Sequence, residues 1–238
     1  MIDALINKYA FYILGTKPNM KRTIEIAQEA IEIDGDFCEV GTYIGGNCAI
    51  MGELCTHYGK DKKIYLYDSF VGLPYPTKED LVIPGDPEGV ERTGELKSTG
   101  VSVAPLEWVN RVLDMSGYKN YEIVAGWVQN TLPNNNINKL AFLRLDLDLY
   151  VPTKIALAEL HHKVVNGGYV FVHDYATLPG CKQAVDEFLD KMKQAILDNL
   201  SGVNNFSDGN YKQALKTLRK LLGGKTTGRK RFTIGLIS

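Results

Sequence analysis

Short apolar runs alternate with longer amphipathic stretches along most of the chain. Apolar runs bounded by turn residues are typical of buried strands, and they occupy 37–40, 64–67, 121–125, 140–145 and 169–172. Stretches with apolar residues at helical spacing lie between or after them, at about 46–57, 106–116, 150–167 and from 180 onward. Strands that alternate with helices predict an α/β fold with a doubly wound, mostly parallel sheet.

Three segments lie outside this alternation. Residues 1–33 predict a helix, a break and a second helix, whereas residues 75–104 are rich in Pro, Gly, Glu and Lys. A loop of that length in a compact domain often covers a site, and we expect this one to be a lid. Residues 200–238 predict a loop, a helix at 211–222 and a closing strand at 232–237. No repeat or linker interrupts the chain, so a single domain is expected.

Composition removes several classes of protein. A net charge of −1 over 238 residues leaves no broad basic surface for nucleic acid, and no apolar run has the length of a membrane span. The amino terminus lacks the basic region that precedes the apolar stretch of a signal peptide. The four cysteines form no C-x-x-C pair, which favours buried free thiols in a reducing compartment. We therefore expect a cytoplasmic protein that binds neither nucleic acid nor membrane.

Acidic residues gather where two of the predicted strands end. Asp146 and Asp148 follow the run at 140–145, and His173 and Asp174 follow the run at 169–172. If these strands are parallel neighbours, the four side chains meet at one edge of the sheet, where open α/β sheets bind their ligands. The spacing of two also places both aspartates on the same side if the strand continues.

Such a group of oxygen ligands suits Mg²⁺, which usually keeps several waters. Unpaired, the carboxylates would repel one another and their pKa values would rise. His173 is the exception in the group, because a neutral imidazole suits softer metals better. From the residues alone His173 is a metal ligand, a base or a hydrogen-bonded neighbour.

The first predicted strand runs into a glycine-containing turn with the pattern E-x-G-x-x-x-G, formed by Glu39, Gly41 and Gly45. Glycines there let the backbone turn sharply and approach a ligand. The dinucleotide fingerprint G-x-G-x-x-G is absent because Tyr43 occupies the second glycine position. This disfavours a pyrophosphate and suits S-adenosylmethionine, a cofactor without phosphate, while a tight turn with no ligand is the alternative.

Asp68 ends the second predicted strand. It follows the glycine turn by about 25 residues, the place where nucleoside-binding α/β folds carry an acid that receives both ribose hydroxyls. A helix cap or a local turn contact is the alternative for this residue taken alone.

Five segments in this order resemble the macrocin O-methyltransferase family: GDFCEVGTYIGGN, YDSFVGLP, GWVQNTLP, LRLDLDLYVPT and GGYVFVHDYATLPGCKQAVDEF. Members of this family depend on S-adenosylmethionine and Mg²⁺ and methylate sugar hydroxyls. The resemblance covers roughly residues 35–190 and implies the class I methyltransferase fold, which is Rossmann-like.

The resemblance also implies a role for each matching residue. It implies that the cofactor is bound by Glu39, Gly41, Tyr43, Gly45, Asp68, Ser69, Gly126 and Trp127. It implies metal ligands at Asp146 and Asp174, and Asp148 as the general base. Many members carry a second aspartate where this chain has His173, which makes His173 the candidate for the third ligand.

The expected activity is therefore methyl transfer from S-adenosylmethionine to a hydroxyl of a small molecule, most simply a sugar, with a divalent metal. Three alternatives stay open. They are a phenolic, catechol-like acceptor, a nicotinamide-dependent oxidoreductase on a similar sheet, and a cofactor-binding module without catalysis. Family likeness also favours a homodimer.

Overall fold

Six parallel strands form the centre of the part of the chain that the computed structural model describes, which comprises residues 1–80, 98–201 and 231–234. Their order in the sheet is β3-β2-β1-β4-β5-β6. The strands are β1 (Asp36–Val40), β2 (Ile64–Asp68), β3 (Tyr121–Ala125), β4 (Leu140–Leu145), β5 (Val164–Val172) and β6 (Arg231–Ile234). The doubly wound parallel sheet expected from the alternation of patterns is confirmed.

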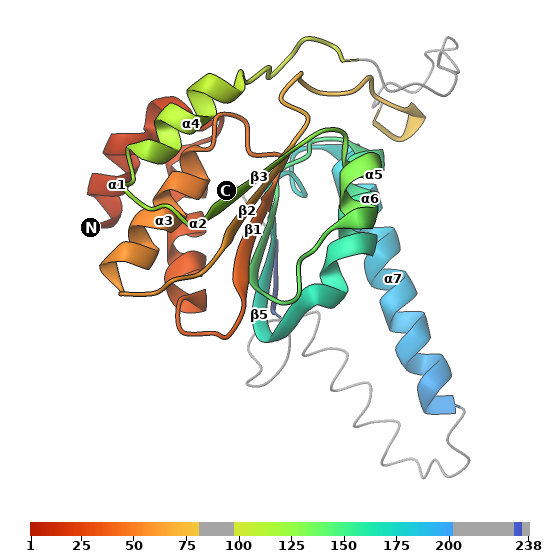
Figure 1. Ribbon diagram of the computed structural model, residues 1–238. Coiled ribbons are helices and arrows are strands. Elements are labelled where there is room, and N and C mark those ends of the chain that lie inside the picture. The colour runs from red at the N-terminus through yellow and green to blue at the C-terminus, as the bar shows by residue number, and fades with distance from the viewer. Residues whose placement is uncertain (81–97, 202–230, 235–238) are drawn as a thin grey trace.

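Helices cover both faces of the sheet (Figure 1). One face carries α1 (Ile2–Tyr9), α2 (Lys17–Ala30), α3 (Gly46–His57) and α4 (Leu106–Asp114), and the other carries α5 (Val128–Thr131), α6 (Tyr150–Leu160) and α7 (Pro179–Ser201). Short 3₁₀ turns are η1 (Ala10–Tyr12), η2 (Lys78–Asp80), η3 (Leu132–Asn134) and η4 (His161–Lys163). None of the helices in these described ranges is long and apolar enough to cross a membrane.

Two apolar cores lie between the sheet and its helices, because successive side chains of a strand point to opposite faces. Phe37, Phe142 and Phe171 pack toward α2 and α3, whereas Cys38 and Leu143 pack toward α6 and α7. All five side chains are fully buried. Strands buried on both faces read as continuous apolar runs, which is why they were visible in the sequence.

The register of the central strands places the site. Val40 pairs with Tyr67 on one side and with Leu145 on the other, and Leu145 pairs with Val172. The next residue of each strand therefore stands in one row along the carboxyl edge, namely Gly41, Asp68, Asp146 and His173. The chain order reverses between β1 and β4, and ligands bind at such switch points.

The expected helix over 150–167 is wrong in its second half. Helix α6 ends at Leu160, η4 follows, and Val164 already begins β5, where it pairs with Leu140. The side chain of Val164 is buried against the sheet, so its apolar character serves a strand and not a helix.

The outer segments agree with expectation where the structure describes them. Helices α1 and α2 form the predicted helix pair at the amino terminus, and β6 is the closing strand. Most of the segment expected to be a lid, 81–97, and the helix expected at 211–222 lie outside the described residues.

Candidate active site

A cavity with about 850 Å³ of empty space, part of it open to solvent, lies at the carboxyl edge of the sheet. Five of the residues expected to bind the cofactor line this cavity, namely Gly41, Tyr43, Asp68, Ser69 and Trp127. Asp146, Asp148 and His173 line it as well. The structure thus brings the glycine turn and the acidic group into one space, as their places in the sequence predicted.

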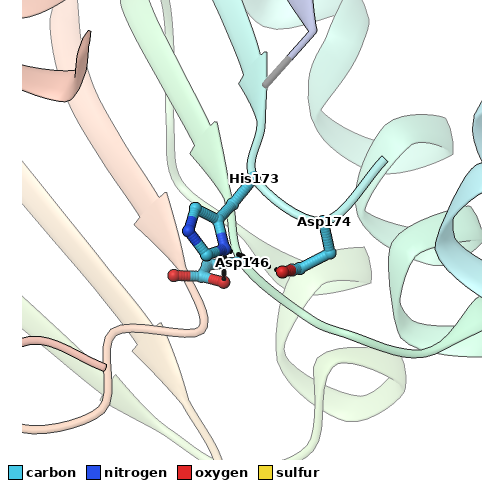
Figure 2. A group of neighbouring side chains, drawn as sticks. All are labelled: Asp146, His173 and Asp174. Carbon is cyan, nitrogen blue, oxygen red and sulfur yellow. Dashed lines mark hydrogen bonds and ion pairs between the residues drawn. The ribbon is translucent and has the colours of Figure 1, made fainter. Parts of the chain in front are cut away.

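The side chains of Asp146, His173 and Asp174 point toward one another (Figure 2). His173 Nδ1 lies 2.9 Å from Asp146 Oδ1 and 2.7 Å from Asp174 Oδ1. Each residue offers one ligand atom, and these atoms all lie within 4.8 Å of one another.

This donor set fits a divalent ion. Neighbouring ligands of an octahedral ion bound at about 2.1 Å are about 3 Å apart, which is close to both distances from Nδ1. Two carboxylates and one imidazole also supply two negative charges, so a divalent cation is neutralised. Of the part of the chain that the structure describes, this is the group of His, Cys, Asp and Glu side chains arranged to hold an ion.

Neighbouring groups determine the charges of Asp146 and His173. Burial alone would raise the pKa of Asp146, but Arg144 and His173 hold it well below its usual range. Burial works against a charged His173, but its hydrogen bonds to Asp146 and Asp174 raise its pKa to about 10. A proton on Nδ1 therefore stands between the two carboxylates, and it must leave Nδ1 before that atom can bind an ion.

Asp148 reaches the cavity by a different route from the one expected. Strand β4 ends at Leu145, and Asp148 has φ of +59°, so the chain turns instead of continuing as a strand. A left-handed backbone is tolerated by aspartate better than by most residues. Burial, followed by the nearby charges of Asp174 and Asp146, raises the pKa of Asp148 to about 7. A carboxyl group of that kind can exchange a proton near neutral pH.

Glu39 lies beneath the cavity and does not line it. Its carboxylate is fully buried and accepts hydrogen bonds from Arg144 (2.6 Å), Asn47 (3.0 Å) and the Cys48 thiol (2.9 Å). Arg144 donates to Asp146 as well, over 2.7 Å. The expectation that Glu39 binds the cofactor stays a prediction, and in the structure this side chain is linked to Asp146 through Arg144.

The glycines of the turn have reasons within the fold. A Cβ on Gly41, at φ +83°, would stand 1.7 Å from the carbonyl oxygen of Asp146, so only glycine lets the turn pack against β4. Gly45, also at φ +83°, precedes α3, and neither Gly45 nor Gly126 lines the cavity. Close packing at Gly41 and Gly126 and the positive φ of all three positions favour glycine without any ligand, and the expected role of Gly45 and Gly126 in cofactor binding stays a prediction.

Asp68 ties the turn to the end of β2. Its Oδ2 accepts from the backbone N–H groups of Thr42 (2.8 Å) and Tyr43 (2.9 Å), and its Oδ1 accepts from that of Phe70 (2.8 Å). Burial raises the pKa of Asp68, and these hydrogen bonds work against that rise. A carboxylate oxygen can accept two hydrogen bonds, so Oδ1 can also accept from a hydroxyl such as that of a ribose.

A family model described as macrocin O-methyltransferase (TylF) matches residues 9–208. The chain belongs to this family. The recognition made from the five sequence segments is confirmed.

Two relatives of the macrocin O-methyltransferase family illustrate its scope. Demethyldecarbamoylnovobiocin O-methyltransferase of Streptomyces niveus is 34% identical over 189 residues, which cover 76% of this chain and 66% of the relative. The second is the 8-demethyl-8-(2,3-dimethoxy-alpha-L-rhamnosyl)-tetracenomycin-C 4'-O-methyltransferase of Streptomyces olivaceus. It is 30% identical over 176 residues, covering 72% of this chain and 64% of the relative. The chain thus spans slightly less than two thirds of the length of each.

The solved structure of the O-methyltransferase NovP resembles this chain with a TM-score of 0.61 at 32% identity, covering 75% of this chain and 74% of NovP. The sheet and its flanking helices therefore follow a methyltransferase architecture, and the Rossmann-like class expected from the resemblance is confirmed.

In this macrocin O-methyltransferase family member, the amino-terminal segment completes the site. Leu14 lines the cavity, and the side-chain amide of Asn19, in the first turn of α2, lies 2.8 Å from His173 Nε2. Asn19 is buried, and its backbone is fixed by Thr16 and Thr23. Neither Leu14 nor Asn19 was expected from the sequence. An apolar residue shortly before a helix, or a polar residue in its first turn, gives no sign of a contact with a residue so far along the chain.

Proposed function

We propose that this protein is an S-adenosylmethionine-dependent O-methyltransferase that acts on a hydroxyl of a sugar or glycosylated metabolite. The observation that carries the proposal is the single cavity shared by the turn at Gly41 to Tyr43, the ends of β2 and β4, and the acidic group around His173. Membership of the macrocin O-methyltransferase family supports it, as does the rhamnosyl group in the name of the Streptomyces olivaceus relative.

The cofactor would occupy the half of the cavity over β1 and β2. Asp68 and Ser69 would receive the ribose, with Tyr43 and Trp127 beside it, because these residues line the wall nearest the turn. S-adenosylmethionine supplies a methyl group that is already activated for transfer. The protein then has to align donor and acceptor and keep water away.

The acceptor would lie over β4 and β5. Asp146, His173 and Asp174 would hold a divalent ion, which lowers the pKa of a hydroxyl that binds it. Asp148 stands on the same cavity wall and would take the hydroxyl proton as general base, for which its pKa of about 7 is suitable. Val151 and Pro152 add apolar surface to this wall.

The test compares cofactors first and acceptors second. S-adenosylhomocysteine and NAD are each titrated into the protein while its thermal midpoint is followed. We expect stabilisation by S-adenosylhomocysteine alone. Methyl transfer from S-adenosylmethionine to a panel of rhamnosides and catechols is then measured by mass spectrometry, with and without a chelator. Stabilisation by NAD instead, or transfer to catechols with none to glycosides, would contradict the proposal.

The four free cysteines are all buried, which supports the expectation of a reducing compartment and hence of a cytoplasmic enzyme. A homodimer stays a prediction, to be checked by the molar mass in solution.

A further inference from the structure

The imidazole of His173 is held at both nitrogens. Nδ1 lies 2.9 Å from Asp146 Oδ1 and 2.7 Å from Asp174 Oδ1, while Nε2 lies 2.8 Å from the Asn19 amide. The ring therefore aims one nitrogen at the point where both carboxylates converge (Figure 2). Its opposite nitrogen meets Asn19, a buried residue of α2. A ring that only filled space would not need a polar partner on each side.

A nitrogen ligand changes which ion such a group prefers. Mg²⁺ strongly favours oxygen ligands and keeps several waters, whereas imidazole suits divalent iron, cobalt, nickel and zinc. Carboxylate oxygens bind these transition ions as well as Mg²⁺. His173 is therefore expected to shift the preference of the site toward transition ions and away from Mg²⁺, compared with the same site carrying an oxygen ligand at position 173.

Ion binding through Nδ1 has a defined proton balance. In the structure the amide nitrogen of Asn19 faces Nε2, so Nε2 accepts and the ring proton is on Nδ1. When an ion binds, the Nδ1 lone pair goes to the ion, the ring proton moves through solvent to Nε2, and the new Nε2–H needs an acceptor. Asn19 can serve as that acceptor by turning its amide through half a revolution, because the oxygen and nitrogen of an amide occupy equivalent places. Histidine ligands are generally oriented by a partner on the second nitrogen in this way.

We propose that the centre formed by Asp146, His173 and Asp174 selects a divalent transition ion over Mg²⁺, with His173 Nδ1 as a ligand and Asn19 as its positioning residue. This inference rests on the metal site of the proposed function and specifies which ion that site takes.

The decisive experiment measures the ion and not the reaction. Co²⁺ is titrated into the purified protein and followed by its visible absorption, and Mg²⁺ is then added as competitor. The same ratio of affinities is measured for His173→Asp, which replaces the nitrogen by an oxygen ligand. We expect the preference for Co²⁺ over Mg²⁺ to fall by about tenfold or more in His173→Asp. An unchanged ratio would overturn the proposal.

The protein loaded with Mn²⁺ gives a second readout that needs no variant. Electron spin-echo envelope modulation should show coupling to one imidazole nitrogen in the natural protein, and its absence there would also overturn the proposal. Because this measurement uses the unaltered chain, the proposal remains decidable even if His173→Asp does not fold.

Asn19 is tested with two variants of similar size, one apolar and one that keeps an oxygen acceptor. Asn19→Leu removes the partner of Nε2 and should weaken Co²⁺ binding by about 10- to 100-fold, whereas Asn19→Asp keeps an acceptor and should restore it. Equal loss in both variants would remove Asn19 from the proposal. Binding of S-adenosylhomocysteine, followed in each variant, reports whether the rest of the cavity is intact.

These outcomes separate the inference from the proposed function. Nitrogen coordination in a protein that transfers no methyl group would leave the ion assignment standing and refute the methyltransferase proposal. Methyl transfer by a protein without nitrogen coordination would support the methyltransferase proposal and refute the ion assignment.

Discussion

Arg144 Nη1 lies 2.6 Å from Glu39 Oε1, and neither side chain is more than 1% exposed. The same nitrogen donates to Asp146 over 2.7 Å. One buried guanidinium thus joins the base of the glycine turn to a candidate metal ligand. Burial raises the pKa of Glu39, and Arg144 works against that rise, so the ionised form of Glu39 depends on Arg144.

Arg144→Met is expected to destabilise the protein by about 3–5 kcal/mol, because it leaves Glu39 and Asp146 as buried carboxylates without a counter-charge. Equilibrium unfolding in urea measures the loss. The double variant Arg144→Met with Glu39→Gln should recover part of the loss, since one of the unpaired charges is removed. Arg111→Met is the matched control, because Arg111 pairs with Glu107 at an exposed surface, and it should cost less than about 1 kcal/mol. Equal losses in the two arginine variants would contradict the buried pairing.

A second prediction concerns the close approach of the glycine turn to β4. Gly41→Ala places a Cβ 1.7 Å from the Asp146 carbonyl oxygen, whereas Gly167→Ala, at nearly the same φ of +85°, meets no atom within 4 Å. Gly167→Ala should cost only the strain of a left-handed alanine, about 1–2 kcal/mol. Gly41→Ala should cost several kilocalories more and weaken binding of S-adenosylhomocysteine. The thermal midpoint and the affinity for S-adenosylhomocysteine are compared between the two variants. Similar effects in both would show that the turn can move away from β4 at little cost.

A third prediction follows from the burial of all four cysteines. Burial raises the pKa of Cys55 to about 11 and that of Cys181 to about 12, and it raises those of Cys38 and Cys48 well above their ordinary value. A raised pKa keeps each thiol neutral, and at pH 8 only about 0.1% or less of Cys55 and Cys181 is the reactive thiolate. A thiol reagent at pH 8 should label the native protein very slowly and all four cysteines in guanidinium. Rapid labelling of the native protein would disprove the burial of at least one.

The sheet and the convergence of the site residues could be predicted because two features of the sequence mark each buried strand, namely an apolar run and a polar residue directly after it. The run at 140–145 is apolar except for Arg144, and it ends at the polar Asp146. Since parallel strands end at one edge, the polar residues after each run had to meet there. Pairing of Leu145 with Val172 confirmed this.

Other features were hidden because they arise only from tertiary contacts. Val164 fits a helical stripe as well as a strand, and only its pairing with Leu140 decides between them. Asn19 looks like an ordinary first-turn residue, yet its partner His173 lies 154 positions away. Arg144 did carry a signal, because a charge within an apolar strand requires a buried partner of opposite charge.

A fourth prediction concerns Asp80. It lies in η2, the last described turn before 81–97, and contacts helices α6 and α7. Asp80 Oδ1 accepts from the backbone N–H of Tyr150 over 2.7 Å, and its Oδ2 accepts from Thr77. A Cβ on Gly180 would stand 1.8 Å from the same Oδ1, so α7 also packs closely against it. Asp80 thereby caps α6 from outside its own segment.

Asp80→Ala should cost about 0.5–2 kcal/mol, the usual loss on removing a cap. Urea unfolding measures this against Asp114→Ala, which removes an exposed carboxylate paired only with Lys119 and should change stability by less than about 0.5 kcal/mol. A loss no larger than that of Asp114→Ala would mean that water replaces the cap at no cost.

The last prediction tests Asp148 as the base. Asparagine has the same shape and tolerates the left-handed φ of +59° found there, so Asp148→Asn changes the chemistry while the backbone stays. Because an amide cannot take the hydroxyl proton, methyl transfer should fall by about 100- to 10,000-fold. Affinities for S-adenosylhomocysteine and Co²⁺ should change little, since Asp148 is assigned to neither ligand. Asp114→Asn, at an exposed position, controls for the loss of one carboxylate. Full activity of Asp148→Asn would transfer the role of base to another group, and a joint loss of Co²⁺ binding would make Asp148 a ligand instead.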